Sequence, residues 1–238
     1  IVRTGNTMSD LSFRQTIHDL LKNLNGVEPL KRLFWTELNY KRENQTLSRR
    51  GWPGSTAAFL ADDPLLFASG GEGDAFHVLY CRLPDEGRLL LTKERPVVNR
   101  LLKDHLDALF IFSDKTQTHW HFVNVRDAKG KAQSERRVLR RISIVPNTGL
   151  RTATERISLL DLNRIQPDMF GIPVLEIQKL HNEAFDVEKV TKDFYREIAN
   201  WYFWALKHIR FPKDATKEKD GLDHISVIRL ITRLIFCW

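Results

Sequence analysis

The stretch from residue 105 to residue 126, HLDALFIFSDKTQTHWHFVNVR, constrains the fold of this chain more than any other segment. It contains two apolar runs, DALFIFS and HWHFVNV, both rich in β-branched and aromatic residues, and the polar connector DKTQT separates them. Two such runs joined by a short polar segment are typical of paired β-strands. The sequence therefore predicts an antiparallel hairpin here.

The predicted hairpin also carries polar residues at the positions that a metal-dependent nuclease uses. In such a site an Asp at the start of one strand faces a D/E-x-K triplet late on its partner, so that two carboxylates share Mg²⁺ and the Lys orients a water. Asp107 begins the first run, and Asn124 and Arg126 occupy the D/E and K positions of the second. Asn124 is neutral and Arg126 stays protonated, so we expect a degenerate site without bound metal. In it, Arg126 would pair with Asp107.

Strand and helix patterns surround the hairpin. The segment AFHVLYCRL (75–83) predicts a strand, residues 94–103 a helix with Pro96 in its first turn, and RRVLRRISIV (136–145) a last strand. This order of strand, helix and three strands predicts an α/β or α+β domain with a mixed sheet.

The chain before this sheet predicts two helices and two loops. Apolar spacing and end signals indicate helices over residues 10–24 and 29–38. The segment between residues 40 and 54 is polar, basic and rich in turn residues, and GGEG at residues 70–73 has the same character. Both predict loops.

A segment rich in Pro and Gly, RIQPDMFGIP (164–173), predicts a domain boundary. Beyond it, apolar residues recur every three or four positions from Val187 to Ile209, which predicts a long helix. We therefore expect a nuclease-like α/β domain with N-terminal helices over residues 1–165. We expect a helical connector over residues 166–238, truncated at its C-terminus because its last apolar helix has no Gly, Pro or polar cap.

Positive charge is concentrated in one region of the chain. The 37 Lys and Arg residues exceed the 30 Asp and Glu residues and give a net charge of +7. Arginine forks match phosphate oxygens, and counterion release makes Arg clusters effective on nucleic acid. A solvated strand edge guarded by charge is the alternative. The residues that predict a surface for double-stranded DNA are Arg136, Arg137, Arg140, Arg141, Arg151 and Arg156.

Several classes of protein are excluded by what the sequence contains. Cys81 and Cys237 are the only cysteines and lie far apart, which indicates a reducing cytoplasm and neither a disulfide framework nor a Cys-based zinc site. The longest apolar run, residues 225–238, contains two Arg and is too short to span a membrane. The glycine motifs of phosphate-binding loops, dinucleotide-binding folds and serine hydrolases do not occur. We therefore expect no cofactor in this part of the chain.

Two further groups allow a functional and a structural interpretation. His119 and His121 share one face of a strand and could bind a metal together, but no third ligand has a suitable spacing. The aromatic stripe of residues 202–209 could stack on unpaired bases, but its helical spacing favours a core.

An ordered set of segments covers most of the chain from about Ala75 to Trp238. The segments are FHVLYCRL, ERPVVNRLL, DALFIFSD, HWHFVNVR, RRI, LRTATERISLLDL, FYREIANWYFWAL and HISVIRLITRLIFCW. In this combination they resemble the N-terminal region of large bacterial fused restriction-modification proteins of the type IIG sort, which join a DNA adenine methyltransferase to other modules.

The resemblance implies a cytoplasmic, DNA-acting protein whose methyltransferase domain lies downstream of Trp238. That domain has an S-adenosylmethionine pocket and an NPPY-type catalytic tetrapeptide, which this sequence lacks. S-adenosylmethionine, and Mg²⁺ where a nuclease is retained, would therefore belong to the full-length protein. Related proteins often carry a PD-(D/E)xK nuclease at the N-terminus, and Asp107, Asn124 and Arg126 stand at its acid and D/E-x-K positions.

These observations favour a DNA-engaging N-terminal module of a restriction-modification or phage-defence protein, without cleavage activity of its own. One alternative is a structural interaction domain that docks the downstream methyltransferase and touches no DNA. The other is an active Mg²⁺-dependent endonuclease completed by loop acids, for which the candidates are Asp62, Asp63, Glu72 and Asp74. The full-length protein would be a DNA adenine methyltransferase with or without an endonuclease.

Overall fold

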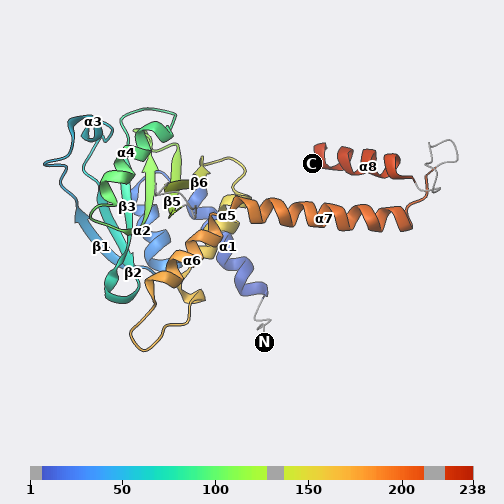
Figure 1. Ribbon diagram of the computed structural model, residues 1–238, viewed down its shortest axis with the longest axis horizontal. Helices are drawn as coiled ribbons and strands as arrows, with labels where there is room; N and C mark the ends of the chain where they lie inside the picture. The colour runs from blue at the N-terminus through green and yellow to red at the C-terminus, as the bar shows by residue number, and fades with distance from the viewer. Residues whose placement is uncertain (1–6, 128–136, 212–222, 238) are drawn as a thin grey trace. The chain divides into compact units, whose positions relative to one another are not determined.

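The computed structural model describes residues 7–127, 137–211 and 223–237, and it divides into two compact units, Ile1–Phe185 and Asp186–Trp238. The first unit contains one six-stranded mixed sheet whose spatial order is the order of the strands along the chain (Figure 1). The strands are β1 (Lys41–Thr46), β2 (Leu65–Gly70), β3 (Phe76–Arg82), β4 (Asp107–Ser113), β5 (Trp120–Asp127) and β6 (Arg137–Ile144). The mixed sheet agrees with the prediction.

One crossover gives the sheet its mixed character. β3 and β4 are parallel and are connected through helix α4 (Leu91–Leu101), whereas all the other neighbouring strands are antiparallel. Parallel strands require such a crossover, because the chain must return to the same end of the sheet. β4 and β5 pair antiparallel, as the hairpin pattern predicts.

Helices cover both faces of the sheet and create two cores. Leu109 and Ile111 of β4 belong to the larger core, whereas Phe110 and Phe112 belong to the core beneath α4, as the two-residue period of a strand requires. The helices of the first unit are α1 (Thr7–Lys22), α2 (Val27–Arg32), α3 (Gly54–Ala57), α4, α5 (Arg151–Ile157) and α6 (Val174–Ala184), with a π-helical turn η1 (Leu33–Glu37) and the 3₁₀ turns η2 (Glu72–Asp74), η3 (Ser158–Leu160) and η4 (Leu162–Arg164). Residues from α1, α2, α5 and α6 line the larger core.

Residues 41–46 form a strand, so the loop predicted between residues 40 and 54 is wrong there, whereas residues 47–53 lie in no helix or strand, as predicted. β1 has the sequence KRENQT, and five of its six residues are exposed. Among the described strands it pairs with β2 alone and is therefore an edge strand, where charged side chains discourage pairing with other chains. Polarity that indicates a loop is therefore also compatible with a strand at an edge.

The first compact unit extends beyond the boundary expected at residue 165. Helix α6 contributes Ile177 and Ala184 to the larger core, and Phe185 follows them there. The Pro- and Gly-rich segment is therefore a connection within this unit, which ends at Phe185.

The second unit contains two helices, α7 (Val187–His208) and α8 (His224–Phe236). Ala205, Val227 and Ile231 form their small buried contact. Many large apolar side chains of this unit stay exposed, and they are Phe194, Tyr195, Trp201, Phe203, Trp204, Ile225, Ile228, Leu234, Ile235 and Phe236. No helix among the described residues has the length and apolarity needed to cross a membrane.

A buried polar pair connects helix α6 to the rest of the first unit. His181 of α6 is completely buried, with its Nε2 atom 2.7 Å from the hydroxyl oxygen of Tyr40 and its ring centroid 4.6 Å from that of Phe76. Its Nδ1 atom has no hydrogen-bond partner among the residues that the structure describes. Burial disfavours the charged imidazolium and lowers the pKa of His181 to about 3.

This histidine should make the first unit sensitive to acid. Between its ordinary pKa of about 6.5 and its folded value of about 3, the unfolded chain binds a proton that the folded chain does not. The resulting stability is fully present above pH 6.5 and is lost as the pH falls toward 3. We predict that this group lowers the free energy of unfolding by about 1.4 kcal/mol per pH unit in that interval, measured by denaturant titration.

The matched control removes both polar partners together. In the Tyr40→Phe, His181→Phe double variant, the slope of the free energy of unfolding against pH should fall by about 1.4 kcal/mol per pH unit, because the titrating imidazole is gone. Neither a hydroxyl nor an imidazole is then left buried without its partner. An unchanged slope in the double variant would show that His181 does not couple folding to protonation.

Candidate functional site

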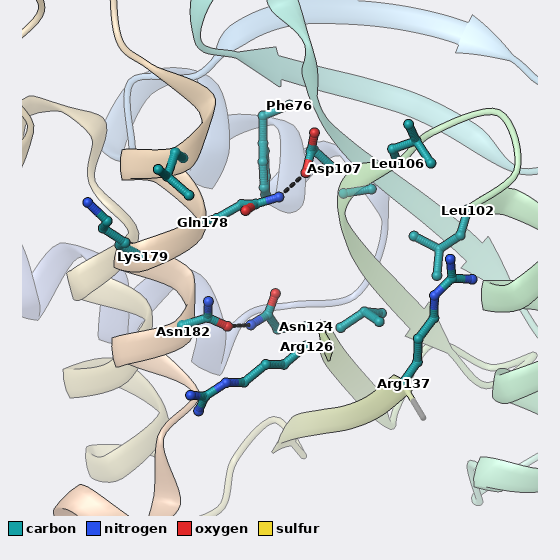
Figure 2. A pocket seen from close by; sticks show the side chains of 13 residues that line it. Phe76, Leu102, Leu106, Asp107, Asn124, Arg126, Arg137, Gln178, Lys179 and Asn182 are labelled. Carbon is teal, nitrogen blue, oxygen red and sulfur yellow. Dashed lines mark hydrogen bonds between the residues drawn. The ribbon is translucent and has the colours of Figure 1, made fainter. Parts of the chain in front are cut away.

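A cavity of about 620 Å³ lies between α6, the first residue of β4 and the end of β5 (Figure 2). Its apolar lining consists of Phe76, Leu102, Leu106, Ala108, Val125 and Leu175. Its polar lining consists of Asp107, Asn124, Arg126, Arg137, Gln178, Lys179 and Asn182. The three residues that the hairpin pattern singled out, Asp107, Asn124 and Arg126, therefore surround one cavity.

The register of the hairpin explains why these residues converge. Leu109 pairs directly with Asn124, and Asp107 lies two residues before Leu109 on the same strand. Residues two apart on a strand share a face, so Asp107, Asn124 and Arg126 all project toward the face that α6 covers. The sequence spacing alone is enough to predict this convergence.

Helix α6 supplies the opposite wall. Leu175, Gln178 and Asn182 line the cavity at spacings of three and four residues, which places them on one face of the helix. Ile177 and His181 occupy the face that is buried in the core. The boundary predicted at residue 165 assigned α6 to another domain, and for this reason its cavity residues were missed.

Two polar pairs connect the walls at the centre of the cavity. Gln178 donates a hydrogen bond from Nε2 to Oδ1 of Asp107. Asn124 donates from Nδ2 to Oδ1 of Asn182 over 3.1 Å. The expected pair of Asp107 with Arg126 is not formed between these described residues, because Gln178 occupies the carboxylate and the guanidinium of Arg126 points away from it (Figure 2).

Burial is the main electrostatic influence on the single carboxylate of this cavity. It raises the pKa of Asp107, and the nearby His77 opposes this effect. Among the described residues that line the cavity, the cations Arg126, Arg137 and Lys179 outnumber this one acid. The cavity therefore favours a ligand that carries negative charge and hydrogen-bonding groups.

The residues present do not fit Mg²⁺. This ion prefers oxygen ligands with anionic charge and gives up its waters reluctantly, but only Asp107 among the described lining residues is an acid. Within the described ranges, no group of three or more His, Cys, Asp or Glu side chains is arranged to hold a metal ion.

The loop acids proposed to complete a nuclease site do not line the cavity. Asp62 forms an ion pair with Arg82, and Asp63 forms one with Arg49. Asp74 pairs with Lys41 on the edge strand. The remaining candidate, Glu72, lies in the turn η2.

The Arg cluster is divided between two elements. Arg137, Arg140 and Arg141 lie on β6, where Arg140 is in register with Asn124. Arg151 and Arg156 lie on α5, and Arg136 falls outside the described residues. Arg141 is 3.6 Å from the buried carboxylate of Glu94, and Arg151 pairs with Glu155, so part of this charge is neutralised locally. Of the described members, Arg137 lines the cavity.

His119 and His121 contact different residues. Nδ1 of His121 contacts Oε1 of Glu94, which is completely buried on α4. His119 instead contacts the hairpin turn, with Nδ1 3.1 Å from Oγ1 of Thr118. Glu94 was not predicted to be a buried acid, because a Glu in the first turn of a helix is ordinary in a sequence.

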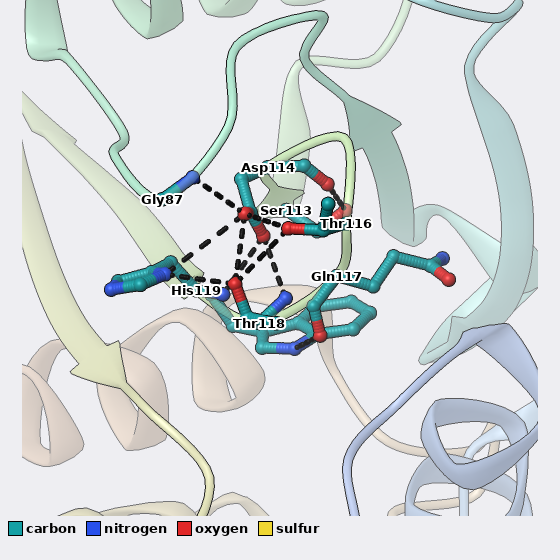
Figure 3. A network of polar contacts seen from close by, with 8 residues as sticks. Gly87, Ser113, Asp114, Thr116, Gln117, Thr118 and His119 are labelled. Atoms are coloured by element: carbon teal, nitrogen blue, oxygen red, sulfur yellow. Dashed lines mark hydrogen bonds and ion pairs between the residues drawn. The ribbon is translucent and has the colours of Figure 1, made fainter.

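Asp114 organises the turn of the hairpin (Figure 3). Its Oδ1 accepts hydrogen bonds from the backbone N–H groups of Thr118 and His119, and its Oδ2 accepts from the N–H of Gly87 and the hydroxyls of Thr116 and Thr118. Burial opposes ionisation, but these hydrogen bonds outweigh it and hold the pKa of Asp114 well below its usual range. These five hydrogen bonds connect the carboxylate to the hairpin turn and to Gly87, which is a structural role.

Comparisons of the chain with protein-family models, with curated proteins and with solved structures find no match. The resemblance to the N-terminal regions of type IIG proteins therefore rests on the sequence segments alone.

If the hairpin has the geometry of a nuclease, its missing chemistry can be restored. We predict that Asn124→Asp combined with Arg126→Lys creates a site for Mg²⁺ or Mn²⁺, because a second carboxylate then lies beside Asp107 and a Lys completes the D/E-x-K triplet. Isothermal calorimetry should detect the metal in this variant, and nicking of supercoiled plasmid should report activity.

The control for this prediction is Asn182→Asp combined with Arg126→Lys, which has the same charge but places the new acid on α6. It should bind the metal more weakly. If the unaltered protein cleaved plasmid in Mg²⁺ and Asp107→Ala abolished that cleavage, the site would be an active nuclease and the degenerate assignment would be wrong.

Proposed function

We propose that this chain is a DNA-engaging N-terminal module of a bacterial restriction-modification or phage-defence protein, and that it does not cleave DNA itself. The observation that supports this function best is the cavity at the hairpin, whose described lining residues include three cationic side chains, three carboxamides and one carboxylate. In the proposed full-length protein, a downstream methyltransferase domain supplies the S-adenosylmethionine site.

The placement of the cations supports contact with phosphate. Arg126 and Arg137 come from neighbouring strands, and Lys179 comes from α6 on the other side of the cavity. Lys179 is 60% exposed and forms an ion pair with Glu176, which solvent weakens. Arginine forks bind phosphate oxygens bidentately, and lysine adds a point charge. A nucleic-acid backbone could therefore contact two walls of the cavity at once.

Asp107 is the one acid among the described residues that line the cavity, and this supports binding without cleavage. Hydrolysis by this type of nuclease needs a metal held by two carboxylates and a base that orients water. Here the second acid is replaced by Asn124, whose amide already bonds to Asn182, and Arg126 replaces the Lys. These groups favour holding DNA in place.

A second candidate function is docking of the downstream methyltransferase without DNA contact. The observation in its favour is the exposed apolar surface of the second unit, where Trp201 and Trp204 of α7 are each 53% exposed and Phe236 of α8 is 85% exposed. Exposed apolar patches of this kind mark interaction surfaces. The two candidate functions use different units of the chain, and DNA binding by the first unit would distinguish them.

The proposed DNA contact predicts a specific dependence on salt. Replacing Arg126, Arg137 and Lys179 by Ala should weaken duplex binding evenly across sequences, because phosphate contacts carry no sequence information. It should also flatten the slope of log K against log salt by about one unit for each lost contact. Fluorescence anisotropy with a labelled duplex at several salt concentrations measures both quantities.

A matched triple variant separates a local effect from the loss of net charge. Lys22, Arg50 and Arg164 are exposed and lie outside the cavity. Their replacement by Ala also removes two arginines and one lysine, so the change in net charge is equal. This variant should keep most of the affinity and slope. If both triple variants behaved alike, or if the unaltered protein bound no DNA, the proposed function would be rejected.

A further inference from the structure

The cavity has the size and lining of a site for a small organic ligand. Its volume of about 620 Å³ lies within the range of about 300–1,000 Å³ that is usual for such sites. A phosphate or a single ion would leave most of this space to water. The apolar side chains of Leu102, Leu106 and Leu175 also line it, and a flat apolar ring could pack against them.

The polar pairs at its centre match the edge of a nucleobase. The ionised carboxylate of Asp107 only accepts hydrogen bonds, whereas the amides of Gln178, Asn124 and Asn182 both donate and accept. An exocyclic amino group can donate to a carboxylate, and the neighbouring ring nitrogen can accept from an amide. Asn or Gln with adenine, and acids with cytosine, use these contacts.

The cationic side chains could bind the phosphate of a nucleotide. In Figure 2, Arg126 lies beside Asn124, Arg137 lies apart from the amide pairs with its guanidinium near Leu102, and Lys179 lies on α6. A phosphate attached to a base held at the centre would therefore meet positive charge at the margin of the cavity. A bare nucleoside would lack this contribution.

We propose that this cavity binds a single unpaired nucleotide whose base carries an exocyclic amino group, with the base at Asp107 and the amides and the phosphate at the cationic side chains. This inference rests on the proposed function, since it specifies what the DNA-engaging site holds. The nucleotide reaches the cavity either as part of a nucleic-acid strand or as a free mononucleotide.

The proposed nucleotide is unpaired because its Watson–Crick edge is the edge that we place at Asp107 and the amides. In a duplex, the amino group and ring nitrogen of the Watson–Crick edge are already bonded to the partner base, and the base is stacked. Taking a base out of a duplex costs a few kcal/mol, and this cost is absent in a single strand. The cavity should therefore favour single strands, frayed ends or mismatches over intact duplex.

The first test uses the unaltered protein. The free ligands are dAMP and dTMP, and the strands are a labelled single strand of deoxyadenylate and its duplex with deoxythymidylate. We expect dAMP to bind about 5- to 150-fold more tightly than dTMP, which is the factor that corresponds to the 1–3 kcal/mol of a bidentate base contact. We also expect dAMP to displace the single strand. Equal affinity for dAMP and dTMP, or a bound strand that dAMP fails to displace, would overturn the inference.

The second test assigns the contacts. Asp107→Asn keeps the shape of the side chain but removes the anionic acceptor, so dAMP should lose about 10-fold in affinity while dTMP changes little. Arg126→Ala should weaken both mononucleotides together. The matched control is Asp104→Asn, an exposed acid outside the cavity, which should change neither. If Asp107→Asn left the preference for dAMP intact, the base would not lie at Asp107.

The outcomes separate this inference from the proposed function. Salt-dependent duplex binding without a preference among mononucleotides would retain the function and reject the nucleotide site. Selective binding of dAMP without any affinity for single or double strands would retain the site, identify a free mononucleotide as its ligand and reject the DNA-engaging role. Binding of none of these ligands would reject both.

Discussion

The attachment of α6 to the sheet is the interaction on which the candidate site depends. Ile177, Ala184 and Phe185 bury apolar surface in the larger core, and His181 meets Tyr40 within it. This buried face fixes the rotation of the helix, so the opposite face presents Gln178 and Asn182 to the hairpin. Without α6, Asp107 and Asn124 would lie on an open sheet face with no second wall.

The number of acids decides what such a cavity can hold. A metal-dependent nuclease concentrates carboxylates, since a divalent cation must be compensated after it loses water. In this chain the hairpin directs one acid, one amide and one arginine to the same place, and α6 adds two more amides and a lysine. The result is a polar cavity with excess positive charge, which suits an anionic ligand with a hydrogen-bonding edge. The same strand geometry can therefore serve binding in place of hydrolysis.

The sequence predicted the parts of the fold that local periodicity determines. The hairpin, the strand at β3, the helix α4 and the convergence of Asp107, Asn124 and Arg126 all follow from spacings within about 20 residues. β1 escaped prediction because an edge strand has no buried face to impose alternation. The contribution of α6 escaped because Gln178 lies 71 residues from Asp107, and a Pro- and Gly-rich segment separates α6 from the sheet. No local pattern reveals a contact over that distance.

Photo-crosslinking tests the central claim that this cavity is the contact with nucleic acid. A single-stranded oligonucleotide with one 8-azidoadenine would be irradiated with the protein, and the labelled peptides identified by mass spectrometry. The account predicts labels in peptides from residues 102–126 and 174–182, which supply the two walls of the cavity. Labels confined to α7 and α8, whose exposed aromatic side chains could also stack on bases, would contradict it.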